Sequence, residues 1–499
     1  MEIKTYTMPI AESDADVCLI YAFEDNPQLI DITDNLDRVL NGAIRDVIAT
    51  GDFTGKSGQI TIFYPRGAVK TKRIILVGLG KQDSLTPDSI RRAVGTGIRR
   101  ARELKAGRVA TVITSHPKIN PVDVARAVVE AALLSAYKYH GQKSDNTGEN
   151  FPTALDIHVP VETDDIQQGI KIGLAFASGA IMSRDMVNLP PNICTPIYIA
   201  SMARNMADGV GLKTQVFDRD TMDELRMGAV LAVAQGSANP PRFIILEHNA
   251  DQADTLDTVV LVGKGVTFDT GGYSIKTAEG MVGMKADMSG AAAVIGAMQT
   301  IAMLNLPLHV VGLAPAAENM ISSNAYRPQD VITASNGKTI EIISTDAEGR
   351  LLLADALVYA NRYKPKAVVD IATLTGACVV ALGPVAAGFF CTDAALRDKL
   401  LSAADATQEK LWELPLFPEY KKALESDTAD LKNTGGRNGG VGTSAVFLQQ
   451  FTDYPAWAHI DMAGVMSDVA DNPYVPPKGG SGYGARLLAE FAKQWAEQK

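Results

Sequence analysis

The sequence predicts an α/β protein of two α/β domains, in which a smaller N-terminal domain is joined by a long helix to a larger domain with a central mixed, mostly parallel sheet. The first reason is length, since 499 residues exceed what one hydrophobic core usually organises. The second is the alternation of strand-like and helix-like segments, which is typical of parallel sheets covered by helices. A composition of 46% hydrophobic and 21% charged residues is that of an ordinary soluble globular protein.

The first domain is expected to span residues 1–162. Its expected strands are short apolar runs bounded by polar or turn residues, at 15–23, 59–65, 73–80, 108–114 and 154–161. Two longer segments, 87–104 and 121–139, carry apolar residues at helical spacing. Alternation of this kind predicts a largely parallel sheet.

A linking helix is expected over residues 163–189, because the charged run VETDDIQQGIK leads into helical spacing that ends at the breaker LPPN. The larger domain is then expected over 190–499. Its strands are expected at 258–263, 307–315, 338–344, 366–373 and 386–391, and its helices at 290–304 and 351–363. A doubly wound or closely related sheet of this kind binds ligands beyond the carboxyl ends of its strands.

Charge and cysteine content indicate the compartment and exclude some partners. A formal net charge of −10 argues against a dedicated nucleic-acid binder. The N-terminus, MEIKTYTMPIAESDAD, has early acids and no apolar secretory core. The four cysteines form no CxxC pair and are expected to be reduced thiols: Cys18, Cys194, Cys378 and Cys391. A cytoplasmic protein is therefore expected.

One uncharged stretch, residues 371–392, is long enough to cross a membrane. Gly376, Gly383, Pro384 and Gly388 interrupt it, so we interpret it as strand, loop and strand in a buried sheet. No membrane span is expected.

Several familiar motifs are incomplete. Residues 51–57, GDFTGKS, imitate a phosphate-binding loop but have three residues between the glycines where four are needed. The Gly-rich turns after 258–263 and 73–78 lack the third glycine of a dinucleotide fingerprint. The six histidines include no HExxH pair, and there is no GxSxG serine elbow. Nucleotide binding, a histidine-rich zinc site and serine hydrolysis therefore have no support.

Two clusters of charged residues stand against apolar strands and small-residue helices, where uncompensated charge is costly. The first lies in VGKGVTFDTGGYSIK and MKADMSGAAAV, the second in STDAEGRLLLADAL. Their members are Lys264, Asp269, Lys276, Asp287, Asp346, Glu348 and Arg350. Carboxylate oxygens gathered at strand ends suit divalent cations, and a pair of such cations suits hydrolysis.

Each of these residues also has a structural interpretation. Thr345 and Glu348 match a capping box opening an apolar helix, and Asp287 could be an N-terminal helix acid. Arg350 fits less well, because a cation in the first turn opposes the helix dipole unless it faces an anion. Lys264 directly follows a strand expected to be buried, and a buried lysine loses its proton readily. All the structural interpretations together require several independent coincidences, which favours a site.

The chain resembles the leucyl (cytosol) aminopeptidase family of bacterial-type dinuclear metallo-aminopeptidases. STDAEGRL is similar to that family's NTDAEGRL signature, and VGKGVTFDTGGYSIK and MKADMSGAAAV look like its metal-binding segments. RDMVNLPPNICTP, DIATLTGA, WAHIDMAG and KGGSGYGARLL extend the resemblance over about residues 180–490. Ser344 and Tyr273 depart from the family pattern, at positions that are not ligands and that affect only the detail of the pocket.

The resemblance implies two divalent metal ions per subunit, manganese or zinc, with magnesium also accommodated. One ion would be held by Asp269, Asp346 and Glu348. The other would be held by Lys264, Asp269, Asp287 and Glu348. A water shared by the metals would attack the peptide carbonyl, Lys276 would stabilise the oxyanion, and Arg350 would hold a bicarbonate that shuttles the proton.

The resemblance also implies the substrates and the assembly. N-terminal Leu and other apolar residues would be released from peptides with broad tolerance. Thr373–Ala377 would line the side-chain pocket, with Met281 and Met284 as further candidates for its wall. A homohexamer is expected. Two alternatives stay open: a two-metal phosphoesterase using the same carboxylates, and a DNA-binding accessory role, which the acidic composition disfavours.

Overall fold

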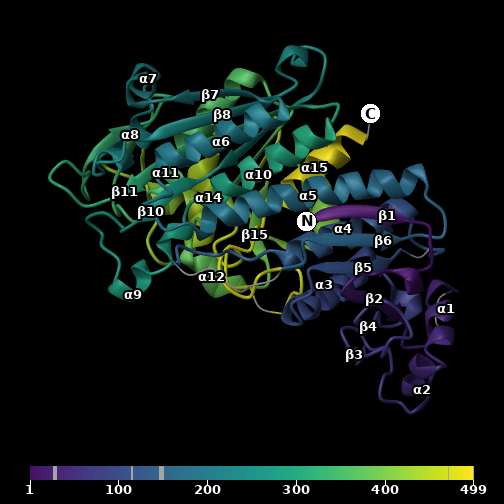
Figure 1. Cartoon of the computed structure of the whole chain (residues 1–499). Helices are drawn as coiled ribbons and strands as arrows, with labels where there is room; N and C mark the ends of the chain where they lie inside the picture. Colours follow the sequence, from purple (N-terminus) through teal and green to yellow (C-terminus); the bar gives the residue numbers. More distant parts are fainter. Residues whose placement is uncertain (26–30, 114–115, 145–150, 470, 498–499) are drawn as a thin grey trace. The chain divides into compact units, whose positions relative to one another are not determined.

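The computed structural model describes residues 1–25, 31–113, 116–144, 151–469 and 471–497 (Figure 1). By contacts the chain divides into two compact units. One comprises Met1–Ala177 with Asp471–Pro477, and the other Ser178–Ala470 with Lys478–Lys499. The long helix α5 (Asp164–Asn188) occupies the segment where a linking helix is expected, and the division falls within it.

The first unit contains a six-stranded sheet in the order β1-β6-β5-β2-β4-β3, parallel except for the β3–β4 pair. Its strands and the helices between them are β1 (Glu2–Tyr6), β2 (Val17–Ala22), α1 (Asp31–Val39), α2 (Ala43–Ala49), β3 (Ile60–Phe63), β4 (Arg73–Gly78), α3 (Pro87–Glu103), β5 (Arg108–Val112), α4 (Pro121–Ala136) and β6 (Ala154–His158). The five expected strands and both expected helices are confirmed, with ends shifted by a few residues. Residue 114, the end of one expected strand, lies outside the described residues.

The second unit is built on a larger mixed sheet in the order β16-β15-β18-β14-β9-β11-β8-β7, with β10 paired to β11. Its strands are β7 (Lys213–Phe217), β8 (Arg242–His248), β9 (Thr258–Gly263), β10 (Gly265–Asp269), β11 (His309–Asn319), β14 (Ala367–Ala372), β15 (Ala387–Cys391), β16 (Leu411–Glu413) and β18 (Trp457–Asp461). The pairs that join β10, β11, β9, β14 and β18 are parallel. The expected fold class, two α/β domains with a mostly parallel sheet in the larger, is confirmed.

Helices cover both faces of this sheet. α6 (Pro196–Val210) and α10 (Ser289–Leu304) pack on one face, and α15 (Ala485–Glu497) packs against α10. α8 (Gly228–Ala234) and α11 (Gly349–Ala360) pack on the other face, and α14 (Gly440–Gln449) packs against α11. The smaller helices are α7 (Arg219–Glu224), α9 (Ala278–Met281), α12 (Gly376–Leu382) and α13 (Ala394–Thr407). β9 and β14 are buried along their whole length, as expected for parallel strands covered on both faces.

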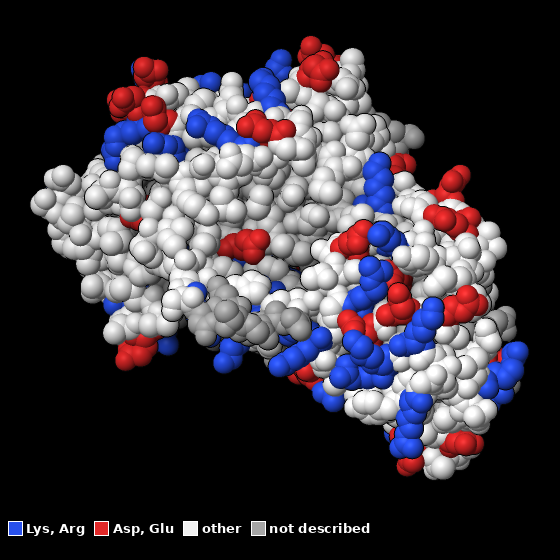
Figure 2. Space-filling model, in the orientation of Figure 1, with Lys and Arg blue, Asp and Glu red and all other residues white. Residues whose placement is uncertain are grey.

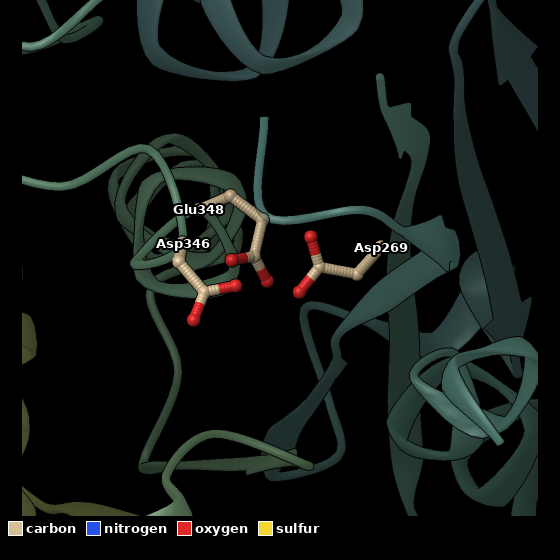
Figure 3. Close-up of side chains that lie close together, drawn as sticks. All are labelled: Asp269, Asp346 and Glu348. Carbon is tan, nitrogen blue, oxygen red and sulfur yellow. The ribbon is translucent and has the colours of Figure 1, made fainter. Parts of the chain in front are cut away.

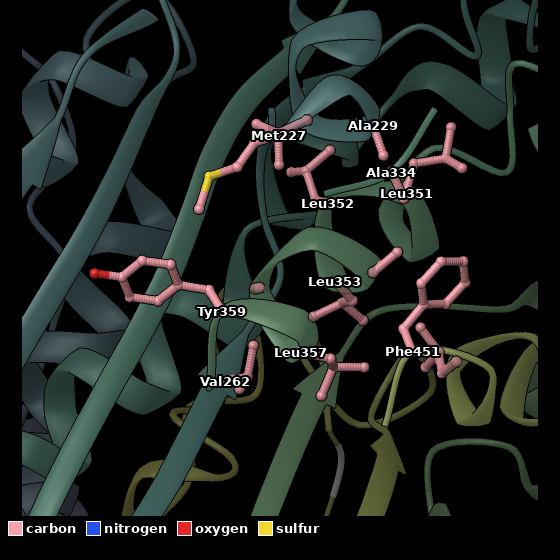
Figure 4. Close-up of a cluster of buried hydrophobic side chains, with 14 of the residues drawn as sticks. Met227, Ala229, Val262, Ala334, Leu351, Leu352, Leu353, Leu357, Tyr359 and Phe451 are labelled. Carbon is pink, nitrogen blue, oxygen red and sulfur yellow. The ribbon is translucent and has the colours of Figure 1, made fainter. Parts of the chain in front are cut away.

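Helix α11 is mostly apolar on all its sides, with Arg350 and Asp355 as its charged residues, and it is buried almost throughout. Leu352, Leu353 and Tyr359 on this helix pack with Met227 and Phe451 from the neighbouring helical segments (Figure 4). A helix that is hydrophobic all round is stable only when it is enclosed. This packing fixes the helix whose N-terminal end carries the second charged cluster.

Two sequence expectations need correction. The segment KTIEIIS contains β13 (Thr339–Glu341), which lies in a separate small sheet with β12 (Val331–Thr333) and β17 (Leu431–Lys432) rather than in the central sheet. Residues 371–392 form strand, short helix and strand, because Thr375 caps the helix α12 where a loop is expected.

Another segment, Ala278–Leu304, is long and apolar enough to cross a membrane by length and composition. Of its most apolar window, 78% is buried inside the structure, as in the core helix of a soluble protein. On the face that Figure 2 shows, the Lys and Arg side chains are interspersed with Asp and Glu rather than gathered in one broad basic surface.

A buried ion pair in the sheet predicts a pH dependence of stability. His459 Nδ1 lies 2.5 Å from Asp370 Oδ1, and Trp457 Nε1 donates to the other oxygen at 2.7 Å. Burial by itself lowers the pKa of His459, but the adjacent Asp370 carboxylate outweighs burial and raises it. Asp461 adds to the raised pKa, and Arg350 opposes it.

We expect this pair to stabilise the fold fully below the unfolded-state histidine pKa of about 6.5, and to lose that effect as the pH rises through the higher folded-state value. The free energy of unfolding should therefore fall with rising pH in that window. His459→Asn keeps a donor toward Asp370 without the titration and should flatten the slope. Urea denaturation across the window measures both proteins, and equal slopes would contradict the prediction.

Candidate metal centre

Three carboxylates converge where β10 ends and α11 begins. Asp269 is the last residue of β10, and Asp346 and Glu348 lie just before α11. One oxygen from each side chain lies within 4.8 Å of the others. Figure 3 shows the Asp346 and Glu348 carboxylates directed toward Asp269 from the start of the helix. Residues far apart in sequence thus meet in one acidic cluster.

The alternative interpretation of Thr345 and Glu348 as a capping box is wrong, so the Glu348 side chain is available to the cluster. Glu348 is itself the N-cap residue, with helical φ −81° and ψ −36°, and its side chain makes no capping hydrogen bond. The Thr345 hydroxyl accepts from Ser274 N at 2.8 Å and donates to Gly271 O at 2.6 Å. Thr345 therefore joins the two cluster-bearing segments instead of capping α11.

The turn after Asp269 requires its two glycines. Gly271 and Gly272 have φ of +83° and +60°, which favour glycine. A Cβ on Gly271 would lie 2.5 Å from Ser274 O and 2.9 Å from Asp346 Oδ1. Asp269 Oδ1 accepts from Gly271 N and from Asn319 Nδ2, both at 2.8 Å. The turn thereby brings Asp269 close to Asp346.

Lys264 joins the fourth carboxylate, Asp287, to the cluster. It directly follows β9, and its Nζ lies 2.8 Å from Asp287 Oδ1 and 2.9 Å from Glu348 Oε1. Its Nζ also donates to Thr373 O at 2.8 Å. Lys264, Asp287 and Glu348 are all nearly fully buried. The expectation that Lys264 is buried is met.

Lys276 approaches the cluster from the other side. Its Nζ lies 2.8 Å from Asp269 Oδ2 and also contacts Asp346 Oδ1. The side chain keeps 16% of its exposure. Lys276 is therefore the more accessible of the two cluster lysines.

Burial and the repulsion between neighbouring carboxylates make it costly for the acidic side chains of this cluster to be ionised. Burial raises the pKa of Asp287 well above its ordinary value, and also raises the pKa of Asp346 and Glu348. Burial alone would lower the pKa of Lys264, but three neighbouring carboxylates outweigh it and raise that pKa. The protein by itself thus does not make Lys264 easy to deprotonate, contrary to the expectation from burial. A dication bound in the cluster would supply the positive charge that favours the ionised carboxylates.

The residues present fit divalent metal ions. Asp287 Oδ2 is buried and has no hydrogen-bond partner among the residues that the structure describes. A buried carboxylate oxygen without a partner is costly unless a cation neutralises it. Four carboxylates and a neighbouring amine are a donor set that magnesium, manganese or zinc can accept.

Arg350 lies next to this centre in sequence but contacts other groups. Its side chain is buried, an Nη donates to Asn433 O at 2.9 Å, and the guanidinium lies 5.9 Å from the Phe447 ring centroid. Burial lowers the pKa of Arg350 to about 10. Its Nε is buried without a partner in the described part of the chain. The structure therefore joins six of the seven predicted residues directly and places Arg350 beside them.

Three residues that support the site were not predicted in that role: Asn319, Thr373 and Asp461. Asn319 ends β11 and donates to Asp269 Oδ1 and to Thr345 O, at 2.8 and 2.9 Å. The Thr373 hydroxyl donates to Asp287 Oδ1 at 2.7 Å. Thr373 and Asp461 lie in the family-like motifs DIATLTGA and WAHIDMAG, whereas for Asn319 the only signal was its place after an apolar strand.

Comparison with known proteins agrees with this site. The catalytic-domain model of the cytosol aminopeptidase family matches residues 181–489, and its N-terminal-domain model matches residues 19–146. The chain is 46% identical over 462 residues to a probable cytosol aminopeptidase of Roseiflexus castenholzii, covering 92% of this chain and 94% of the relative. It is 42% identical to one of Geobacter sulfurreducens, covering 95% and 96%.

Solved structures show the same architecture. A mutant of tomato leucine aminopeptidase superposes with a TM-score of 0.88 and 34% identity, covering 99% of this chain and 96% of that one. The bottromycin maturation enzyme BotP in complex with Mn superposes with a TM-score of 0.84 and 33% identity, covering 97% and 100%.

Fold, carboxylate cluster and comparisons together define a metal-dependent exopeptidase that acts at peptide N-termini. The chain belongs to the cytosol (leucyl) aminopeptidase family, with both its N-terminal and its catalytic domain. The resemblance drawn from the sequence motifs is thereby confirmed.

Proposed function

We propose that this chain is a cytoplasmic, homohexameric aminopeptidase that releases N-terminal Leu and other apolar residues from peptides, with two divalent metal ions per subunit. The observation that carries the proposal is the convergence of four carboxylates with Lys264 and Lys276, where β9 and β10 end and α10 and α11 begin. Asp269, Asp346 and Glu348 would hold one ion. Lys264, Asp287, Asp269 and Glu348 would hold the other, with Asp269 and Glu348 shared.

When bound, the metal ions supply a nucleophile at neutral pH and polarise the scissile carbonyl. The protein positions the donors beforehand, because Thr345, Asn319 and Thr373 hold carboxylates or the turns that carry them. Preorganised donors need no rearrangement during the reaction.

Lys276 would stabilise the negative charge that develops on the carbonyl oxygen. Its Nζ contacts Asp269 and Asp346, so the ammonium lies at the edge of the cluster. It is partly exposed, which lets a substrate reach it. A fixed positive charge at this place acts chiefly on the transition state.

Arg350 would hold a bicarbonate, whose chemistry there is proton transfer. Its buried Nε without a partner among the described residues and its place in the first turn of α11 both favour an anion beside it. The side-chain pocket would be lined by residues 373–377, with Met281 and Met284 contributing apolar surface.

The decisive assay reconstitutes metal-free protein with Mn²⁺ or Zn²⁺ and supplies leucine p-nitroanilide. We expect hydrolysis that chelation abolishes and added metal restores, because the cluster has no other source of a nucleophile at neutral pH. p-Nitrophenyl phosphate is the control substrate. Phosphate release without release of p-nitroaniline from the leucine substrate would support the two-metal phosphoesterase instead.

A further inference from the structure

Asp461 is a buried carboxylate outside the predicted ligand set, and it binds one short segment of the chain. It is the last residue of β18 and is fully buried. Its Oδ1 accepts from Leu374 N at 3.1 Å, Thr375 N at 3.4 Å and Ala463 N at 3.2 Å. Its Oδ2 accepts from the Thr375 hydroxyl at 2.7 Å. Hydrogen bonds to a charged acceptor are stronger than those between neutral groups.

The segment that Asp461 binds reaches the candidate metal centre. Residues 373–375, here called the Thr373 loop, join β14 to α12. Thr373 O accepts from Lys264 Nζ at 2.8 Å, and the Thr373 hydroxyl donates to Asp287 Oδ1 at 2.7 Å. Hydrogen bonds therefore connect Asp461 to the Thr373 loop, and other hydrogen bonds connect the same loop to Lys264 and Asp287.

The other half of the centre is held independently of Asp461. Asp269 is bound by Asn319 and Gly271, and the segment before α11 is bound through Thr345 and Ser274. Among the described residues, the hydrogen bonds of the Thr373 loop reach Lys264, Asp287 and Asp461, and none reaches Asp346 or Lys276. Disturbing the loop should thus affect the Lys264–Asp287 end of the centre and spare the Asp346 end.

We propose that Asp461 is a positioning residue that holds the Thr373 loop, and through it Lys264 and Asp287, in the geometry needed to bind the metal ion at their end. This inference rests on the proposed two-ion site. Asp461 does not touch the ion in this scheme. It acts as outer partners of metal ligands generally do, by fixing the orientation of the groups that bind.

Two substitutions test the role. Asp461→Asn keeps the size of the side chain but replaces one acceptor oxygen by an NH₂ group facing donors. Thr375→Val removes the hydroxyl bonded to Asp461 Oδ2, together with the cap on Cys378 N. Thr375→Ser retains both bonds and is the conservative control. Asp355→Asn is the matched control for a buried carboxylate, because Asp355 is fully buried and accepts from Ala229 N, Val230 N and Ser335 N.

Equilibrium dialysis of the full-length proteins against Mn²⁺, with metal counted per subunit, is the main measurement. We expect two tight sites in the wild type, Thr375→Ser and Asp355→Asn. In Asp461→Asn and Thr375→Val we expect one of the two sites to weaken by about 10-fold or more while the other keeps its affinity. Activity lost at low Mn²⁺ should return at high Mn²⁺.

Amide hydrogen exchange of the metal-free proteins supplies a second readout. Exchange at Leu374 and Thr375 should quicken in Asp461→Asn, since both amides lose a charged acceptor. Unchanged affinity at both sites together with unchanged exchange would overturn the proposal. If Asp461→Asn does not fold, the Mn²⁺ affinities of Thr375→Val alone test the proposal. A wild type that binds fewer than two ions would instead refute the proposed two-ion site.

Discussion

Replacing Glu348 with glutamine is expected to lower kcat/KM for leucine p-nitroanilide by about 10³-fold or more at limiting metal, equivalent to about 4 kcal/mol. Glu348 is 2% exposed, and its Oε1 lies 2.9 Å from Lys264 Nζ. It belongs to both proposed ion sites, so loss of its charge weakens both. Glutamine preserves the volume, which separates loss of charge from loss of packing.

The variant should also bind less Mn²⁺ per subunit in equilibrium dialysis. Glu247→Gln is a matched control, because Glu247 is a buried glutamate on β8 whose contacts are Lys213 and His309. It should keep activity and metal content close to the wild type. Wild-type activity in a correctly folded Glu348→Gln protein would remove the basis of the proposed function.

Replacing Lys276 with methionine is expected to lower kcat by about 10²- to 10³-fold, with a small change in KM. The proposed role is stabilisation of charge that appears only in the transition state, so ground-state binding should change little. Methionine approximates the length of the lysine stem without its charge. Steady-state kinetics with the metal at saturation measures both parameters.

Lys276→Met should not weaken Mn²⁺ binding, whereas Glu348→Gln should. The Lys276 ammonium lies 2.8 Å from Asp269 Oδ2 and so opposes a nearby dication. Lys276→Met should therefore bind Mn²⁺ as tightly as the wild type, or more tightly. Lys338→Met, which removes a lysine bonded to Gln450 O, is the control. Weaker Mn²⁺ binding with an unchanged kcat would show that Lys276 supports the metal and not the transition state.

The expected strand set misses the edge strands β1 and β7 and the interior strands β8 and β18. β1 and β7 have no fully buried side chain, so they show little of the apolar run that marks a strand. β8 and β18 lie inside the larger sheet and are almost entirely buried, yet the expected strand set does not include them. The fold class did not depend on these strands, because the parallel central strands carry the strongest apolar signal.

The capping-box interpretation failed for a reason of general interest. The pattern of Thr345 and Glu348 is correct in spacing, but the helix begins only at Gly349, one residue after Glu348. The tertiary hydrogen bonds of Thr345 to Ser274 and Gly271 displace the local capping bond. A local motif predicts a local structure only when nothing distant binds the same atoms more favourably.

By itself, the sequence determined the α/β class, the family and the residues of the acidic cluster, because apolar periodicity and short motifs are local properties of the chain. Only the tertiary structure decided how the cluster is held. The hydrogen bonds from Asn319 to Asp269 and from Asp461 to the Thr373 loop join residues about 50 and 86 positions apart. Such partners are chosen by sheet pairing and by the burial of charge, which no local pattern records.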